Sequence, residues 1–154
     1  MIDLKFWSKL SMVLPLIRED KKDRVGVFVD AENFTLGDFS GILKIAKGYG
    51  NITIKRSYAN WVKSLNDKIQ AISVKYGFKP MHCNDSPNNK NLTDIHMSVD
   101  IMDCLFTKNL DCFILVSADI DFIPVMTKIK EANKKVILLV GQNMPINEFL
   151  HNYC

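Results

Sequence analysis

Two short acidic motifs, each placed directly after an apolar run, are the part of this sequence best suited to chemistry. The motif DAEN at 30–33 follows the apolar run 25–29, and the motif SADID at 117–121 follows the run 113–116. Carboxylates gathered in one place repel one another, so such a cluster calls for a bound cation. Because the candidate ligands are oxygens, the expected cation is a hard one, Mg²⁺ or Mn²⁺. The sequence therefore predicts a metal-dependent enzyme that acts on phosphate esters.

The two apolar runs determine whether these motifs can meet. Each run has about the length of a strand that is buried on both faces, as in a parallel sheet. In such sheets, ligands bind outside the carboxyl ends of the strands, where the strand order reverses. If the two strands are neighbours at that point, Asp30 and Asp119 converge on one site.

Turn formation and helix capping are the alternative explanation for these residues. Asp30 and Asn33 are of types that are common in turns and caps. Either Ser117 or Asp119 could cap the helix that is expected to follow. One cap needs only one such residue, so the second acidic motif favours a functional role for Asp30 and Asp119. For Asp121 the two interpretations stay open.

A third candidate group begins the helix expected at 92–106. Asp94 lies in its first turn, at the edge of the buried arc, where a lone carboxylate would be costly. A metal ion or the helix N-terminus would relieve that cost. The expected core stripe of this helix is Ile95, Val99, Met102 and Phe106. The expected solvent-facing side holds His96, Asp100 and Asp103.

Apolar runs alternate with helical patterns and turn signals along the chain. We expect strands at 25–30, 52–58, 78–82, 112–116 and 135–140. We expect helices near 39–47, 64–76, 92–106 and 123–132. This alternation predicts βαβ units with right-handed crossovers. The fold class is therefore α/β, a three-layer α/β/α sandwich around a mostly parallel sheet of about five strands.

One domain, at 24–154, is expected to follow an N-terminal helical extension at 1–23. The apolar stretch at 6–17 is too short and too charged for a membrane span. We expect it to form an amphipathic helix that covers the core or a partner. That partner could be a second copy of the chain, in a homodimer.

Charge and cysteine content bear on the partners and the compartment. The net charge is +3, and lysine supplies 17 of the 20 basic residues. Lysine attracts phosphate as a point charge, which suits contact with a nucleic-acid backbone better than base reading. A solvated lysine surface is the alternative. The four cysteines form no CxxC pair, which fits a reduced, cytoplasmic protein.

Four segments of the chain resemble one known family. They are VGVFVDAENF, IKRSYANW, KNLTDIHMSVDIMD and FILVSADIDFIPVMTKIKEANKKVILLVG, in that order, within residues 25–141. Together they are similar to the NYN domain, in the LabA/DUF88-like branch of the PIN-like nuclease superfamily. The resemblance implies a PIN-like sheet and metal-dependent RNase activity. Departures from the usual pattern are Ala118 after the serine and Ala31-Glu32 in the first turn, and neither removes a ligand.

The resemblance also implies which residues of this chain form the site, because they stand at the positions of the family's site residues. The residues that match the acidic and polar pattern are Asp30, Asn33, Asp94, Asp119 and Asp121. The expected metal ligands among them are Asp30, Asp94 and Asp119, with Asp121 binding a second metal or positioning the nucleophile. The second-tier candidates are Ser117, Lys90 and Asp100, the last standing where the family often has an acidic residue.

The expected activity is that of an endoribonuclease that hydrolyses RNA phosphodiester bonds. Asn33 and Ser117 would orient the phosphate or a metal-bound water, and Lys90 would counter charge on the phosphate. Tyr58 and Trp61 could stack on bases of the RNA, or they could be buried aromatic anchors. The alternative function is a non-catalytic RNA-binding, regulatory or protein-interaction module on the same fold.

Overall fold

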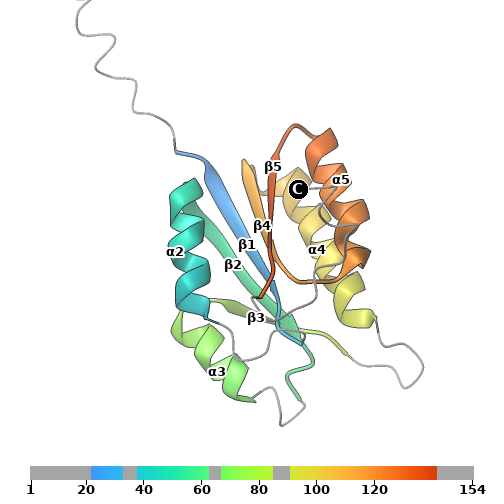
Figure 1. Ribbon diagram of the computed structural model, residues 1–154. Helices are drawn as coiled ribbons and strands as arrows, with labels where there is room; N and C mark the ends of the chain where they lie inside the picture. The colour runs from blue at the N-terminus through green and yellow to red at the C-terminus, as the bar shows by residue number, and fades with distance from the viewer. Residues whose placement is uncertain (1–21, 33–37, 63–66, 85–90, 142–154) are drawn as a thin grey trace, which may run out of the picture.

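A sheet of parallel strands runs through the computed structural model, which describes residues 22–32, 38–62, 67–84 and 91–141. The strands are β1 (Arg24–Asp30), β2 (Asn51–Ala59), β3 (Lys79–His82), β4 (Cys112–Val116) and β5 (Lys135–Leu139). Their order is β3-β2-β1-β4-β5, and every pairing is parallel (Figure 1). The strand order therefore reverses between β1 and β4. The two strands that carry the acidic motifs are neighbours, which meets the condition set for Asp30 and Asp119 to approach each other.

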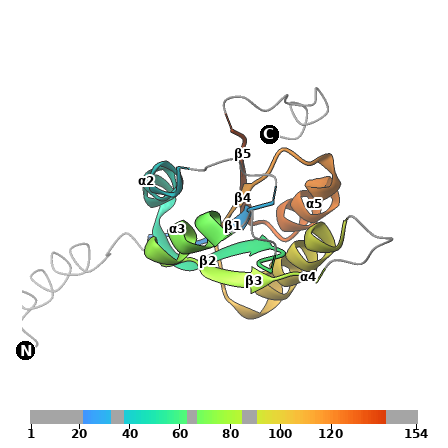
Figure 2. The same ribbon diagram turned by 90° about the horizontal axis from the view of Figure 1, so that it is seen from below.

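Two helices cover each face of this sheet. α2 (Phe39–Tyr49) and α3 (Asp67–Lys75) lie on one face, and α4 (Leu92–Thr107) and α5 (Ile123–Glu131) lie on the other (Figure 1, Figure 2). A short 3₁₀ turn, η3 (Ile120–Phe122), leads into α5. The predicted three-layer α/β/α sandwich is confirmed. Within the described ranges, no helix is long and apolar enough to cross a membrane.

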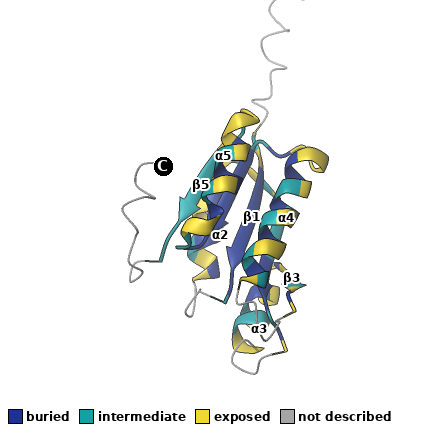
Figure 3. Cartoon of the chain, turned by 90° about the vertical axis from the view of Figure 1, so that its right-hand side faces the viewer, coloured by how far each residue is buried: buried dark blue, intermediate teal, exposed yellow. Residues whose placement is uncertain are grey.

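Alternation along β1 divides its side chains between the two faces of the sheet. Val25, Val27 and Val29 belong to the core beneath α2. Phe28 points the other way, into the core formed with α4 and α5. Because successive side chains alternate along a strand, Asp30 follows Phe28 onto the α4 face. β1 is buried over nearly its whole length (Figure 3), so its last residue brings a carboxylate into a buried setting.

The rotation of α4 about its axis differs from the predicted one. Its buried positions are Thr93, Met97, Ile101, Cys104 and Leu105. The predicted core stripe is wrong, because three of its members are exposed: Ile95 at 50%, Val99 at 64% and Phe106 at 77%. Apolar residues occur on both sides of this helix, so its periodicity fits two rotations. The sheet selects the one that buries Met97 and Ile101.

Several predictions fall outside the described residues. The N-terminal helical extension falls there up to residue 21, as does the tail from residue 142 onward. Asn33 lies in the range 33–37 and Lys90 in the range 85–90, which are not described either. The domain boundary at 24 and the roles of these two side chains therefore stay predictions.

Candidate active site

The carboxyl ends of β1 and β4 bring two predicted site residues into direct contact. The pairing of Val29 with Val116 places Asp30 and Ser117 next to each other as the strands end. The Ser117 hydroxyl donates a hydrogen bond of 3.0 Å to Oδ2 of Asp30. Asp30 is only 1% exposed, so this carboxylate is fixed in a nearly solvent-free position.

The backbone after β4 arranges the second acidic motif. The N–H of Asp119 donates to Oγ of Ser117 at 3.1 Å, and the N–H of Asp121 donates to Oδ1 of Asp119 at 2.9 Å. Asp119 is therefore the N-cap of η3, so the capping alternative is correct for this residue. Capping uses one carboxylate oxygen, however, and leaves the negative charge at the site. Ser117 acts on the site through its hydrogen bond to Asp30.

Asp94 joins this group from the first turn of α4. Burial, followed by the negative charges of Asp30, Asp119, Asp121 and Glu32, raises the pKa of the Asp94 carboxyl to about 7. A shift with these causes requires that the other carboxylates lie near Asp94. Three separate elements, β1, the turn after β4 and α4, therefore direct acidic side chains to one place. The convergence of Asp30, Asp94 and Asp119 on one metal ion stays a prediction.

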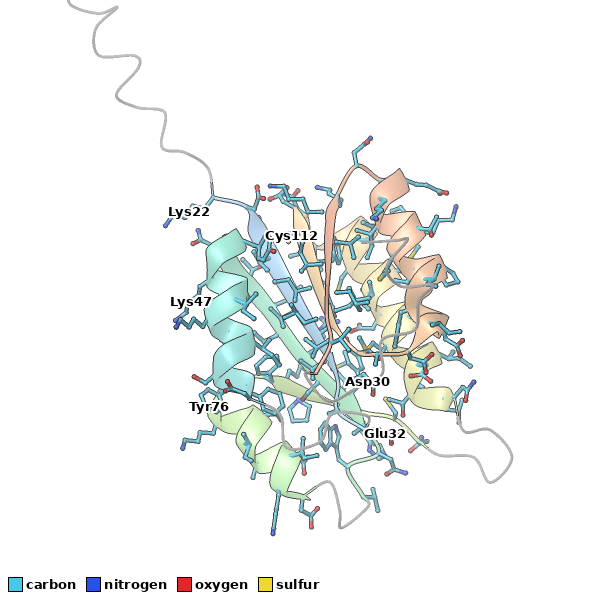
Figure 4. The ribbon with its side chains drawn as sticks, viewed as in Figure 1. Lys22, Asp30, Glu32, Lys47, Tyr76 and Cys112 are labelled. Carbon is cyan, nitrogen blue, oxygen red and sulfur yellow. The ribbon has the colours of Figure 1, made fainter. Side chains whose placement is uncertain are left out.

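Glu32 is a further carboxylate that acts on Asp94, although its sequence pattern indicates only a turn residue. Its Oε1 accepts a hydrogen bond of 2.9 Å from the backbone N–H of Asn60, which ties the turn after β1 to the end of β2. Figure 4 shows Asp30 and Glu32 at the same end of the sheet. The signal that could have identified Glu32 is its place two residues after Asp30, within the same motif.

The donor set suits a hard divalent cation. Carboxylate and hydroxyl oxygens line the site, and none of the ion pairs in the described ranges involves Asp94 or Asp119. The described carboxylates of this site do not gather three ligand atoms within 4.8 Å of one another. A Mg²⁺ ion keeps several of its waters and takes only one or two carboxylates directly, so such a site does not require three ligand atoms in contact.

A different acidic group has its ligand atoms within 4.8 Å of one another, but it is not suited to a metal. Its members are Asp100, Asp103 and Cys104. The Asp100 carboxylate forms an ion pair with Arg56 and accepts a hydrogen bond from the Tyr58 hydroxyl. Nη1 of Arg56 also lies 3.4 Å from Sγ of Cys104. A guanidinium thus supplies the positive charge here that a metal ion would otherwise supply.

This pairing corrects the predicted position of Asp100. The residue was expected on the solvent-facing side of α4, but it is partly buried against β2. His96 and Asp103 are exposed, as predicted. Burial and then the hydrogen bond to Asp100 raise the pKa of the Tyr58 hydroxyl well above its usual range. Tyr58 therefore keeps its proton at neutral pH and donates a hydrogen bond to Asp100.

Tyr58 and Trp61 are buried anchors, and the predicted stacking of these rings on bases is wrong. Tyr58 is 1% exposed and Trp61 is 7% exposed. The indole N–H of Trp61 donates to the carbonyl oxygen of Met81 at 3.0 Å, which joins the turn after β2 to β3. Both side chains therefore serve as anchors of the fold.

Comparison with known proteins identifies relatives of the chain. Residues 24–154 match the NYN domain family. An uncharacterized protein of Methanocaldococcus jannaschii is 30% identical over 143 residues, which cover 86% of this chain and 56% of that protein. The chain thus spans about half the length of this relative. The crystal structure of a protein of unknown function from Vibrio parahaemolyticus has a TM-score of 0.72 at 19% identity, covering 90% of this chain and 93% of the other. That likeness concerns the fold alone.

Proposed function

The chain belongs to the NYN domain family, within the PIN-like nuclease superfamily, and from this premise we propose that it is a metal-dependent endoribonuclease. One observation carries the proposal: where the strand order reverses, burial and then the charges of Asp30, Asp119, Asp121 and Glu32 raise the pKa of Asp94 to about 7. This is the place in a parallel sheet where ligands bind. Charge repulsion of this kind is relieved by a cation.

The proposed ion is Mg²⁺ or Mn²⁺, held by Asp30, Asp94 and Asp119. When bound, it supplies positive charge that stabilises the scissile phosphate and eases deprotonation of an attacking water. Asp121 positions the nucleophile or helps to hold a second ion. Ser117 keeps Asp30 in place through its hydrogen bond.

The protein's own residues complete the proposed site. Asp94 must lose its proton before it can serve as a ligand, because the ion and the proton compete for the same carboxylate. By their places in the sequence, Asn33 orients the phosphate and Lys90 offsets its charge. RNA is the proposed substrate because of the family, and lysines elsewhere on the surface contact its backbone.

A cleavage assay with a matched pair of variants tests this function. Labelled single-stranded and structured RNAs are incubated with Mn²⁺, with Mg²⁺ or with chelator. The wild type should cleave only with a divalent ion, and Asp94→Asn should abolish cleavage. Asp67→Asn is the control, because Asp67 is also an acidic residue in the first turn of a helix but is exposed on α3. It should retain wild-type activity.

Three outcomes of this assay contradict the proposal or replace it. Cleavage in chelator would rule out a metal-dependent reaction. Equal loss in Asp94→Asn and Asp67→Asn would show that the loss comes from the fold and not from the site. RNA binding by the wild type without cleavage under any condition would support the non-catalytic RNA-binding module instead.

A further inference from the structure

A pocket of about 370 Å³ lies beside the carboxylate site, between the end of β3 and α4. Its apolar walls include Met81, Ile95 and Val99. Its polar lining includes His82, His96 and Asp103. The volume is in the range of pockets that hold small organic ligands. The exposed apolar side chains of α4 thus line a concave surface, and the proposed reaction does not use them.

Residues that line the pocket adjoin residues of the proposed active site. Tyr58 lines the pocket and is the register partner of Asp30 across β1 and β2. Ile95 also lines the pocket and directly follows Asp94 in α4. In Figure 2, β3 and α4 lie side by side along this edge of the molecule. A polymer held at the carboxylates therefore has the pocket immediately next to it.

The charges of the lining determine which part of a nucleic acid fits. No lysine or arginine lines this pocket among the residues that the structure describes, whereas Asp100 and Asp103 do. A phosphate would meet these carboxylates and no described cation, so the pocket disfavours it. Apolar walls with imidazoles instead suit a flat, neutral group that hydrogen-bonds at its edge. Single-stranded RNA offers such groups as unstacked bases, which proteins bind on rings that include histidine.

Asp103 is the acceptor that is placed to read such a group. Asp100 is engaged by Arg56 and Tyr58, whereas Asp103 is exposed and its described side-chain hydrogen bond is a long one of 3.4 Å from the Thr107 hydroxyl. An ionised carboxylate only accepts hydrogen bonds, so its partner must be a donor. Ring N–H and amino groups of bases are donors of this kind.

We infer that this pocket binds one unstacked nucleobase of an RNA whose neighbouring phosphate lies at the carboxylate site. The inference rests on the proposed function and adds a base-binding position to it. Apolar contact comes from Ile95 and Val99, ring contact from His96, and edge recognition from Asp103. The exposure of Val99 at 64% follows directly, because this side chain serves the ligand and not the core.

The test measures RNA binding separately from cleavage. All variants are made in an Asp119→Asn background, so that the RNA stays intact, and Mg²⁺ is present throughout. Fluorescence anisotropy gives the affinity for a short single-stranded RNA and for a series in which one nucleotide at a time lacks its base. The pocket variants are His96→Ala and Val99→Ser. The matched control is Val74→Ser, because Val74 is a similarly exposed valine, at 53%, on α3.

The inference predicts one position at which removal of the base weakens binding by roughly tenfold, within the range measured for loss of a stacking contact. His96→Ala and Val99→Ser should weaken binding of the intact RNA by a similar factor. Neither variant should then distinguish the intact RNA from that abasic RNA. Val74→Ser should behave as the parent protein does with every RNA.

Other results overturn the inference in distinguishable ways. If the parent binds RNA and both pocket variants bind every RNA as the parent does, the pocket is not a base site and the proposed function stands. If the variants weaken intact and abasic RNAs equally, the pocket does not read a base. If Val99→Ser instead abolishes a dimer seen by sedimentation without changing RNA affinity, the pocket docks a second copy. If the parent binds no RNA and the wild type cleaves none, the proposed function fails as well.

Discussion

The Asp94 carboxyl shows how position alone changes the chemistry of a residue. Its pKa rises from 3.8 to about 7, first through burial and then through the carboxylates around it. The folded chain therefore binds a proton there that the unfolded chain releases at lower pH. This proton linkage stabilises the metal-free protein fully below pH 4, and the stabilisation is lost as the pH rises through about 7. A cation at the site would take the place of the proton.

Replacing Asp94 by asparagine should remove this pH dependence. In chelator, Asp94→Asn and the wild type should unfold at similar temperatures at about pH 3.5, because the wild-type carboxyl is then protonated in both the folded and the unfolded state. At about pH 8 the variant should be the more stable of the two, since it carries no charge among the other carboxylates. Thermal unfolding followed by circular dichroism across this pH range measures the difference. A constant difference between Asp94→Asn and the wild type at every pH would show that the carboxylates do not act on Asp94.

How far a side chain's position could be predicted depends on whether a local pattern or a distant contact fixes it. Asp30, Asp94 and Asp119 could be predicted because each follows a strand or begins a helix, and parallel strands bring such ends together. Glu32 lies in an irregular turn, and its role depends on a hydrogen bond from Asn60 that no local pattern encodes. Trp61 could not be assigned in advance, because its burial depends on a partner in β3.

At the scale of elements, α4 shows where sequence periodicity reaches its limit. The strands and most helix ends follow from local patterns, and the structure agrees with them. The rotation of α4 about its axis cannot be predicted from local patterns, because this helix has apolar residues on two sides. The ion pair of Arg56 with Asp100 and the hydrogen bond from Tyr58 join α4 to β2 in the observed rotation. That rotation brings Asp94 to the site and leaves Val99 at the pocket.

Breaking the pair of Arg56 and Asp100 should destabilise the protein markedly. The two side chains are only 16% and 19% exposed, so Asp100→Asn leaves a guanidinium largely buried beside a neutral partner. We expect a loss of about 2–3 kcal/mol in the free energy of unfolding, somewhat below the cost for a fully buried pair. Urea denaturation measures this. Adding Arg56→Met should cost less than the sum of the two single changes, with a coupling of about 1–3 kcal/mol.

An exposed pair in the same protein provides the comparison. Lys128 and Glu131 form an ion pair in α5, but their side chains are 60% and 57% exposed. Because solvent screens such charges, Glu131→Gln should change the free energy of unfolding by less than about 1 kcal/mol. If Asp100→Asn has an effect as small as this, or if the changes at Arg56 and Asp100 are additive, the pair does not hold α4 in place.

At the scale of the whole molecule, the site exists only when the chain is folded. Its carboxylates come from β1, from the turn after β4 and from α4. Residues far apart in the sequence therefore meet, as Asp30 and Ser117 do across 87 positions. An unfolded chain offers no comparable cluster. An ion that binds here therefore binds the native state and raises its stability by mass action. Binding of the proposed ion would therefore couple the protein's stability to the topology that gathers these charges.

Adding Mn²⁺ or Mg²⁺ should raise the unfolding temperature of the wild type at neutral pH. At an ion concentration of about 100 times the dissociation constant, the gain is about 2.7 kcal/mol, or about 5–10 °C for a chain of this size. The double variant Asp30→Asn, Asp119→Asn should lose this response, because both β1 and the turn after β4 then lack their ligand. Asp67→Asn should keep the full response, since its carboxylate lies on α3 away from the site. Differential scanning fluorimetry with increasing ion concentration measures the shift, and calorimetry measures binding directly. An unchanged unfolding temperature in the wild type, together with no heat of binding at millimolar ion, would mean that these carboxylates do not form a metal site.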